Sequence, residues 1–535
     1  MRASLTATAM ILTTFTSSWA QAPAPTSLEE RVRSVLMTPG YENASWGILV
    51  VDSETGETIY ERRADELFRP ASVTKLYSCA MGLVELGADH RFRTPVVRRG
   101  EVRDGVLRGD LILIARGDPS MGGRTGPEGT LLFEDNDHTY AGSSGSSNAV
   151  LVASNPLAGL DHLARAVHDE GIRSIEGEVI IDDRLFDAAP SSGSGPRRVS
   201  PIVINDNVID VVIAPGAKVG DRGVVTMVPA TAFARMDALV ETVEEGSRPE
   251  LTVTVVGPRA FRVRGTIPVG HKPFVRIFEI EEPASFARAL FIERLRERGV
   301  EVDATPLGSN PEDSLPPRDD VAGLPRVAEY VSPPFSESLR VILKVSHNLH
   351  ASMLPLLVAA KHGERSLSDG LKREAAVLES LGVAAASISF GGGAGGSVSD
   401  LTTPRATVAL LRGLAKRPDY PVFEAALPVL GRDGTLARAV SPESPARGHV
   451  RAKTGTYWVD NPLTGRSVIT SKALAGTIDT AAGRKLTFAF FLNGVPIPAR
   501  YQRVSDATLD AGRVLGRLAE VFYEWPSTAA ASAPK

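Results

Sequence analysis

The chain has a single cysteine, Cys79, among its 535 residues, so no intramolecular disulfide can stabilise it. A chain of this length can instead bury a large hydrophobic core, spread over about two to four domains. Cys79 falls within an apolar helical pattern that begins at Ser72. This position predicts a small core residue rather than a reactive thiol.

Aromatic residues and positive charge are also scarce. Phe, Trp and Tyr make up 6% of the chain, and the formal net charge is −4. These values exclude the basic, base-stacking surface of a nucleic-acid-binding protein. Residues 21–535 contain no apolar run of about 18 residues, so we expect no stable insertion into a membrane.

The two ends of the chain differ in composition from the rest. Residues 1–20 combine Arg2, a short apolar stretch and the small residues Ser18 and Ala20, which is the pattern of a secretory signal peptide. We therefore expect an exported protein, periplasmic or associated with the cell wall. Residues 527–535 are of low complexity and are expected to form a disordered tail.

Hydrophobic periodicity divides the remaining chain into two kinds of segment. Residues 93–323 consist mainly of short β-rich runs separated by turns, which predicts an inserted β-rich region with two subdomains. The flanking segments, 21–92 and 324–535, mix helical periodicity with strand-like runs. In them we expect helices at 27–37, 72–86, 334–343, 348–360, 368–381 and 506–523, and strands at 46–51, 57–60, 450–454, 472–478 and 486–493.

The most informative motif is Ser72-Val-Thr-Lys75, at the start of an apolar helical run. A Lys three residues after a Ser lies on the same helix face, so the two side chains can be hydrogen-bonded neighbours. A serine hydroxyl needs such an adjacent base to act as a nucleophile. We therefore predict Ser72 as the nucleophile and Lys75 as the general base. The charge of Lys453, together with partial burial, is expected to lower the pKa of Lys75.

A second motif, Ser346-His347-Asn348, follows later in the chain. Ser346 can relay a proton to a leaving amine, and Asn348 can hold a substrate amide and position Lys75. A Ser-His mechanism would depend on His347, but the Ser-Lys pair already supplies a base. On its own the triplet is also typical of a helix cap.

The third motif, Lys453-Thr454-Gly455-Thr456, lies on an expected strand. Gly455 lets a substrate backbone approach, so that an extended peptide can dock along the strand. Lys453 and Thr454 can bind its C-terminal carboxylate. The backbone N–H groups of Thr456 and Ser72 can form an oxyanion hole.

Two other segments invite a binding role. The glycine run 391–396 lacks the Gly-Lys-Ser/Thr of a phosphate loop, so we expect a flexible or tightly turned loop near the site. The run Asp135-Asn-Asp-His138 could bind a cation, but no calcium-loop spacing follows it, and a solvated loop is expected. No cluster has convincing metal-ligand spacing, and the mechanism requires no cofactor.

Taken together, the three motifs resemble those of the exported D-alanyl-D-alanine carboxypeptidases, the class C low-molecular-mass penicillin-binding proteins. The resemblance covers nearly all of residues 21–535. It is also carried by Arg116-Gly-Asp-Pro119, Ser200-Pro-Ile-Val-Ile-Asn-Asp-Asn207, Asp433-Gly-Thr-Leu436 and Ala473-Leu-Ala-Gly476. The long separation between Lys75 and Ser346 is similar to that family and unlike β-lactamases.

This resemblance implies an α/β fold with a penicillin-binding-protein transpeptidase-like (serine β-lactamase-like) domain. That domain would be discontinuous, over 21–92 and 324–535, with large β-rich domains inserted at 93–323. The implied activity is hydrolysis of D-Ala-D-Ala in peptidoglycan stem peptides through a Ser72 acyl-enzyme. Endopeptidase activity on cross-links and inhibition by penicillins and other β-lactams are implied as well.

Three departures from the family pattern bear on substrate preference: His347 in place of the usual Asp, the glycine run 391–396, and an extra segment within 457–471. Two alternatives stay open at this point. One is a β-lactamase-like hydrolase, although no Glu-x-x-Leu-Asn segment lies between the second and third motifs to activate water. The other is a wall-binding protein that is not an enzyme.

Overall fold

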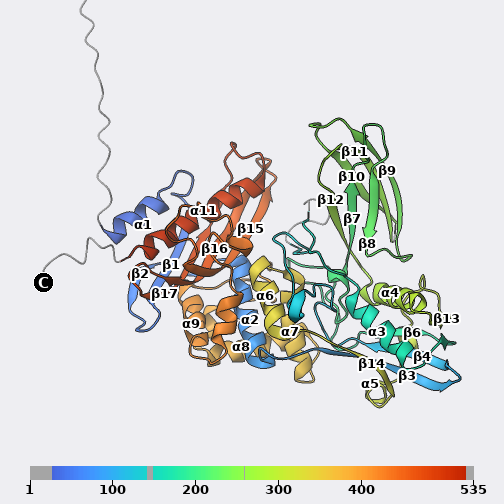
Figure 1. The fold of residues 1–535 in the computed structure, drawn as a ribbon. Coiled ribbons are helices and arrows are strands. Elements are labelled where there is room, and N and C mark those ends of the chain that lie inside the picture. Colours follow the sequence, from blue (N-terminus) through green and yellow to red (C-terminus); the bar gives the residue numbers. More distant parts are fainter. Residues whose placement is uncertain (1–26, 141–148, 258, 526–535) are drawn as a thin grey trace, which may run out of the picture.

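The computed structural model describes residues 27–140, 149–257 and 259–525 (Figure 1). The expected signal peptide at 1–20 and the expected tail at 527–535 lie outside the described residues. Within the described part of the chain, no helix is long and apolar enough to cross a membrane.

One half of the molecule is built on a six-stranded antiparallel sheet in the order β15-β16-β17-β1-β2, with β18 paired to β16. The pairing of β1 with β17 joins the beginning of the described chain to its end, and β15 lies at one edge of the sheet, with β2 at the other. The strands are β1 (Ser45–Asp52), β2 (Thr58–Arg62), β15 (Val450–Asn461), β16 (Arg466–Asp479), β17 (Lys485–Asn493) and β18 (Val495–Pro496).

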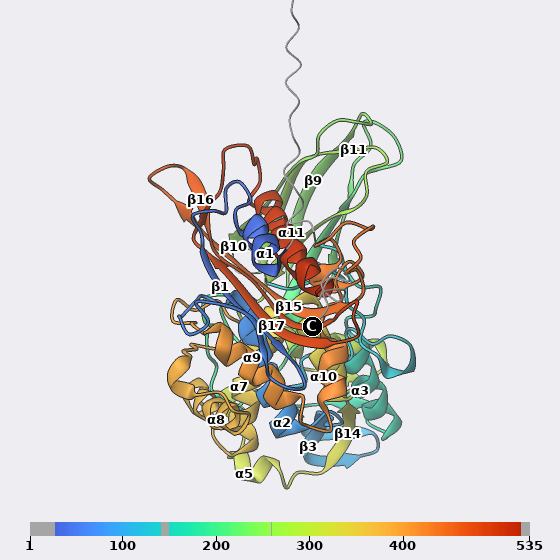
Figure 2. The same ribbon diagram turned by 90° about the vertical axis from the view of Figure 1, so that its left-hand side faces the viewer.

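Helices cover both faces of this sheet (Figures 1 and 2). Along β17, Phe488 and Phe490 enter the core beneath α1 and α11, whereas Ala489 and Phe491 enter the core on the opposite face. This alternation is the period-two pattern of a strand buried on both sides. The first face carries α1 (Leu28–Leu36) and α11 (Val504–Tyr523); the second carries α2 (Thr74–Leu86), α6 (Phe335–Val345), α7 (Asn348–Lys361), α8 (Leu367–Ser380), α9 (Pro404–Leu414) and α10 (Tyr420–Ala426).

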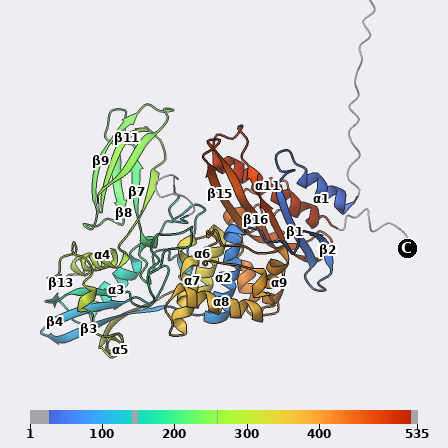
Figure 3. The same cartoon turned by 180° about the vertical axis from the view of Figure 1, so that it is seen from behind.

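The chain between α2 and α6 forms three further sheets, which lie beside the helices of the second face. Figure 3 shows them from behind. One is six-stranded, with β13 (Glu301–Val302), β5 (Ser174–Ile175), β4 (Val106–Ile114), β3 (Arg93–Arg103), β14 (Arg326–Val331) and β6 (Val179–Asp182). Two are three-stranded: β9 (Arg235–Val243), β10 (Glu250–Gly257) and β11 (Ala260–Pro268), and β7 (Val208–Ala214), β8 (Val224–Val228) and β12 (Phe274–Glu279). The helices of this region are α3 (Ala158–Asp169), α4 (Pro283–Glu297) and α5 (Arg318–Val321).

Most elements predicted from periodicity are present. The helix expected at 27–37 begins with a capping box, because Ser27 Oγ accepts a hydrogen bond from the Glu30 N–H while the Glu30 carboxylate accepts one from the Ser27 N–H, each at 3.2 Å. Cys79 is fully buried in α2, which confirms its prediction as a core residue.

Two segments differ from expectation. Asp135 and Asn136 are exposed, as predicted for a solvated loop, but Asp137 and His138 are buried, so the prediction is wrong for the second half of this run. The cause is the buried Arg124, whose guanidinium forms an ion pair with Asp137 at 2.5 Å and lets the carboxylate leave solvent. In addition, β14 (Arg326–Val331) pairs with β3, so these residues lie in a sheet of the inserted region although the sequence placed them after a boundary at 324.

Candidate active site

Ser72 lies in η1 (Ala71–Val73), a short 3₁₀ turn that leads into α2. Lys75 follows in the first turn of that helix, and its Nζ is 3.0 Å from Ser72 Oγ. Lys75 is fully buried, whereas Ser72 is partly exposed. The first predicted pair is therefore in contact, with an accessible hydroxyl held against a buried amine.

The Lys75 amine has two more oxygen neighbours, the Asn348 Oδ1 at 2.6 Å and the Ala394 carbonyl oxygen at 2.7 Å. A neutral amine has two N–H groups and one lone pair. If both N–H groups donate to these two oxygens, the lone pair is left for the Ser72 hydroxyl proton. The surroundings of Lys75 thus suit an amine that accepts a proton from Ser72.

Burial lowers the pKa of Lys75 to about 7, so much of the amine is neutral near pH 7. Burial, rather than the charge of Lys453 that the sequence suggested, is the main cause, and this corrects the predicted explanation. Lys453 is buried too, and burial together with the charge of Lys75 holds its own pKa well below the usual value.

The second motif forms the turn between α6 and α7. Ser346 ends α6 in the left-handed conformation, with φ of 62°, and His347 is the N-cap of α7. Ser346 Oγ accepts a hydrogen bond from Lys453 Nζ at 2.9 Å, while Asn348 contacts Lys75. The triplet therefore caps a helix, the alternative considered for it, and also brings two of its side chains to the two lysines.

The third motif lies on the edge strand β15. A Cβ atom on Gly455 would come within 2.2 Å of the Pro70 carbonyl oxygen, so the missing side chain lets the turn that carries Ser72 pack against β15. Sequence reasoning gave a different reason for this glycine, the approach of a substrate. Thr454 Oγ1 is 2.8 Å from Thr435 Oγ1.

Lys472 was not predicted, yet it belongs to this part of the site. From the neighbouring strand β16 its Nζ donates to Thr456 Oγ1 at 2.8 Å, and burial lowers its pKa to about 8. Its position directly opposite Thr456 in the β15–β16 register could be found only once that register was known.

The glycine run 391–396 forms a tight loop beneath the Ser72 turn, which confirms its predicted place near the site. A Cβ atom on Gly395 would come within 2.0 Å of the Ala71 carbonyl oxygen. Asp400 closes the loop, because its two oxygens accept hydrogen bonds from the N–H groups of Gly391 and Ser397, each at 2.8 Å. Sequence reasoning missed Asp400 and the Ala394 carbonyl.

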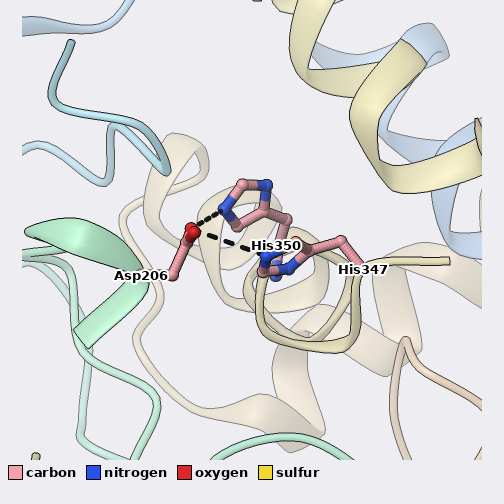
Figure 4. A group of neighbouring side chains, drawn as sticks. All are labelled: Asp206, His347 and His350. Carbon is pink, nitrogen blue, oxygen red and sulfur yellow. Dashed lines mark hydrogen bonds and ion pairs between the residues drawn. The ribbon is translucent and has the colours of Figure 1, made fainter. Parts of the chain in front are cut away.

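His347 is buried and faces the inserted region, with its Nε2 3.5 Å from Asp206 Oδ1. Asp206, His347 and His350 offer ligand atoms that lie within 4.8 Å of one another (Figure 4), and these residue types bind zinc in proteins. However, Arg124 Nη2 lies 2.6 Å from Asp206 Oδ2 and 3.4 Å from His347 Nε2. A guanidinium already provides the positive charge at this carboxylate, so we assign no metal here.

Comparison with known proteins places the chain in a family. The model of the D-Ala-D-Ala carboxypeptidase 3 (S13) family matches residues 28–511, and the chain therefore belongs to this family. A D-alanyl-D-alanine carboxypeptidase of Actinomadura sp. is 31% identical over 505 residues, which cover 89% of this chain and 82% of the relative. The prediction of a serine-type peptidase is thereby confirmed.

Solved structures share the fold. Penicillin binding protein 4 (dacB) from Haemophilus influenzae has a TM-score of 0.67 and 20% identity, covering 92% of this chain and 98% of its own. A second structure of that protein, complexed with a novel β-lactam, has a TM-score of 0.62 and 21% identity, covering 91% and 98%. The predicted penicillin-binding-protein fold with additional β-rich parts is confirmed.

The close contact at Gly455 yields a prediction. Gly455→Ala forces β15 and the Ser72 turn apart, because the added Cβ meets the Pro70 carbonyl oxygen. We expect a loss of about 1–3 kcal/mol in the free energy of unfolding, measured by urea denaturation. Gly323→Ala is the matched control, since its Cβ would have no neighbour nearer than 3.6 Å. Equal stability of the two variants would contradict the packing described for η1 and β15.

Proposed function

We propose that the protein is an exported serine DD-peptidase that hydrolyses the D-Ala-D-Ala bond of peptidoglycan stem peptides through an acyl-enzyme on Ser72. It acts as a carboxypeptidase and, on D-alanyl cross-links, as an endopeptidase, and penicillins acylate the same serine. Family membership and the β-lactam complex of the H. influenzae relative support this proposal. The observation that carries it is the contact of Ser72 Oγ with the buried Lys75 amine.

Acylation begins with attack of Ser72 Oγ on the carbonyl carbon of the penultimate D-Ala, while the hydroxyl proton passes to Lys75 Nζ. The low pKa of Lys75 makes the neutral amine available near pH 7. The negative charge that develops on the carbonyl oxygen is stabilised by the N–H groups of Ser72 and Thr456. Collapse of the tetrahedral intermediate then breaks the amide bond.

The leaving D-Ala nitrogen needs a proton, and Ser346 is the group we assign to this step. Its hydroxyl accepts a hydrogen bond from Lys453 and can pass a proton from the lysines to the nitrogen. A water molecule that replaces D-Ala then attacks the ester carbonyl and gives a proton to Lys75. The bond from the carbonyl carbon to Ser72 Oγ breaks, and Lys75 returns this proton to Ser72 Oγ, which restores the enzyme.

The edge strand β15 provides a binding site for the peptide, which can dock beside it in an extended conformation. Lys453 and Thr454 bind the terminal carboxylate, and Asn348 binds a substrate amide. The pKa of Lys453 is low because the amine is buried near Lys75. A bound carboxylate favours the protonated amine, so substrate binding raises the pKa of Lys453 and charges it.

Substitution of the two reacting residues tests the proposal. We expect Ser72→Ala to abolish release of D-Ala from a peptide ending in D-Ala-D-Ala, and Lys75→Ala to reduce it by about 10²–10⁴-fold or more, because each removes a group that reacts. Ser532→Ala is a matched control, since Ser532 begins a second Ser-x-x-Lys sequence that lies outside the described residues. Near-normal turnover by Lys75→Ala would refute the role of the lysine.

The pKa of Lys75 predicts the pH dependence of acylation. Only the neutral amine accepts a proton, so the second-order rate of labelling by a fluorescent penicillin should rise with pH and level off above a midpoint of about 7. Below that midpoint we expect about a tenfold fall per pH unit. Near-UV circular dichroism at each pH confirms that the fold is unchanged. A midpoint near the ordinary lysine value of 10.5 would contradict the account.

A further inference from the structure

A buried network of charged and imidazole side chains joins the inserted region to the second motif. The proposed acyl-enzyme mechanism uses none of these side chains, and all of them are buried. Five come from the inserted region and two from the beginning of α7: Arg124, Asp137, His138, Asp206 and Asp210, and His347 and His350.

Asp206 lies at the centre of this network. Its Oδ1 accepts a hydrogen bond from His350 Nε2 at 2.7 Å and is 3.5 Å from His347 Nε2, as the dashed lines of Figure 4 mark. Its Oδ2 accepts hydrogen bonds from Arg124 Nη2 at 2.6 Å and from His138 Nδ1 at 2.9 Å. One carboxylate therefore holds two side chains from each part of the molecule.

His347 lies between the beginning of α7 and the inserted region. Its Nδ1 accepts a hydrogen bond from the His350 backbone N–H at 3.4 Å as the N-cap of α7, and its Nε2 lies 3.5 Å from Asp206 Oδ1 and 3.4 Å from Arg124 Nη2. Burial and the neighbouring His350 hold the pKa of His347 well below its usual value, which keeps the ring neutral. The two rings are stacked with centroids 3.8 Å apart.

Burial raises the pKa of Asp206, but the charge of Arg124 and the contact with His347 lower it by more, so the carboxyl group is ionised. Arg124 supplies the positive charge beside this carboxylate.

A second connection runs through the backbone of the inserted region. The Asn348 N–H donates to the Thr139 carbonyl oxygen, and Asn348 Nδ2 donates to the Tyr140 carbonyl oxygen, each at 3.1 Å. The Tyr140 hydroxyl in turn donates to the Asp206 carbonyl oxygen at 2.7 Å. The inserted region therefore fixes the orientation of the Asn348 amide and, with it, the contact of Asn348 Oδ1 with Lys75.

The backbone around Asp206 is strained. Asn205, Asp206 and Asn207 are three consecutive residues in the left-handed region, with φ of 50°, 51° and 56°. This region is unfavourable for residues other than glycine, so the conformation persists only where the surroundings hold it. Asn207 does this in part, since its side chain accepts a hydrogen bond from Ile204 N–H and donates to the Ile202 carbonyl. The segment therefore presents Asp206 in a fixed orientation.

We propose that Asp206 is a positioning residue for the reaction, which it serves from the inserted region. Through His350 and His347 it fixes the first turn of α7, and this turn places Ser346 and Asn348 against the two lysines. The inference rests on the proposed Ser72 acyl-enzyme. It means that the inserted region is required for fast acylation and not only for stability or location.

The test compares acylation by a fluorescent penicillin, per folded protein, in Asp206→Asn, His350→Leu and His350→Gln. Gln places an N–H donor where the imidazole Nε2 lies, whereas Leu fills the space without a donor. We expect the acylation rate to fall on the order of 10–100-fold in Asp206→Asn and His350→Leu, because a catalytic group displaced by about 1 Å costs that much. His350→Gln should stay within about threefold of the wild type, since the donor is restored.

Asp210→Asn is the matched control. It removes a second buried carboxylate of the network, which contacts His138 and Asn205 but not α7. We expect it to lower the thermal midpoint, as Asp206→Asn does, yet to change the acylation rate by less than about threefold. This comparison separates a loss of stability from a loss of positioning.

Several results would overturn the inference. Asp206→Asn acylated at the wild-type rate, even with a lower thermal midpoint, would leave Asp206 with a structural role only. Equal rates for His350→Leu and His350→Gln would do the same, and this pair decides the matter if Asp206→Asn fails to fold. If the purified wild-type protein contained one equivalent of zinc, the cation beside Asp206 would be the metal and not Arg124. The direct contacts of Asp206 with His347 and His350 would then be refuted. A wild-type protein that is not acylated would instead refute the proposed function.

Discussion

The site depends on one constraint above all: the amine of Lys75 must be kept out of water and still touch the Ser72 hydroxyl. In water a lysine is protonated at neutral pH and cannot act as a base. Complete burial lowers the pKa of Lys75 to about 7, and two oxygens from distant parts of the chain occupy its N–H groups. Removing the amine from solvent therefore turns an ordinary side chain into a proton acceptor.

Burial of this amine requires several elements to meet at one place. The Ser72 turn packs against the edge strand because Gly455 has no side chain, and the glycine loop packs beneath the same turn for the same reason at Gly395. The α6–α7 turn closes the remaining side and carries Ser346 and Asn348. Close packing of the backbone therefore buries the Lys75 amine, and only a few polar side chains take part in the reaction.

Local parts of this site could be predicted from the sequence. The Ser72–Lys75 pair follows from helical spacing, and the strand expected at 486–493 follows from its apolar run. The Ala394 and Tyr140 carbonyl groups could not be predicted, because a backbone oxygen has no signature in the sequence. Nor could the link between Asp206 and His350, since these residues are far apart in the chain and meet only after folding.

The error at Asp137 and His138 has a related cause. A short run of Asp, Asn and His reads as solvated when it is considered alone. In the structure Asp137 is neutralised by Arg124, thirteen residues earlier in the chain, and His138 lies between Asp206 and Asp210. Composition reports how polar a segment is but not whether its partners are buried with it. The polar network at α7 is invisible to sequence patterns for this reason.

The central claim is that Ser72 is the nucleophile of an acyl-enzyme, and the most direct measurement is intact mass with peptide mapping after brief exposure to a penicillin. The account predicts one equivalent of a stable adduct, located on the peptide that contains Ser72. An adduct on another peptide, or unmodified protein with unchanged drug, would contradict it. Unmodified protein with consumed drug would identify a β-lactamase instead.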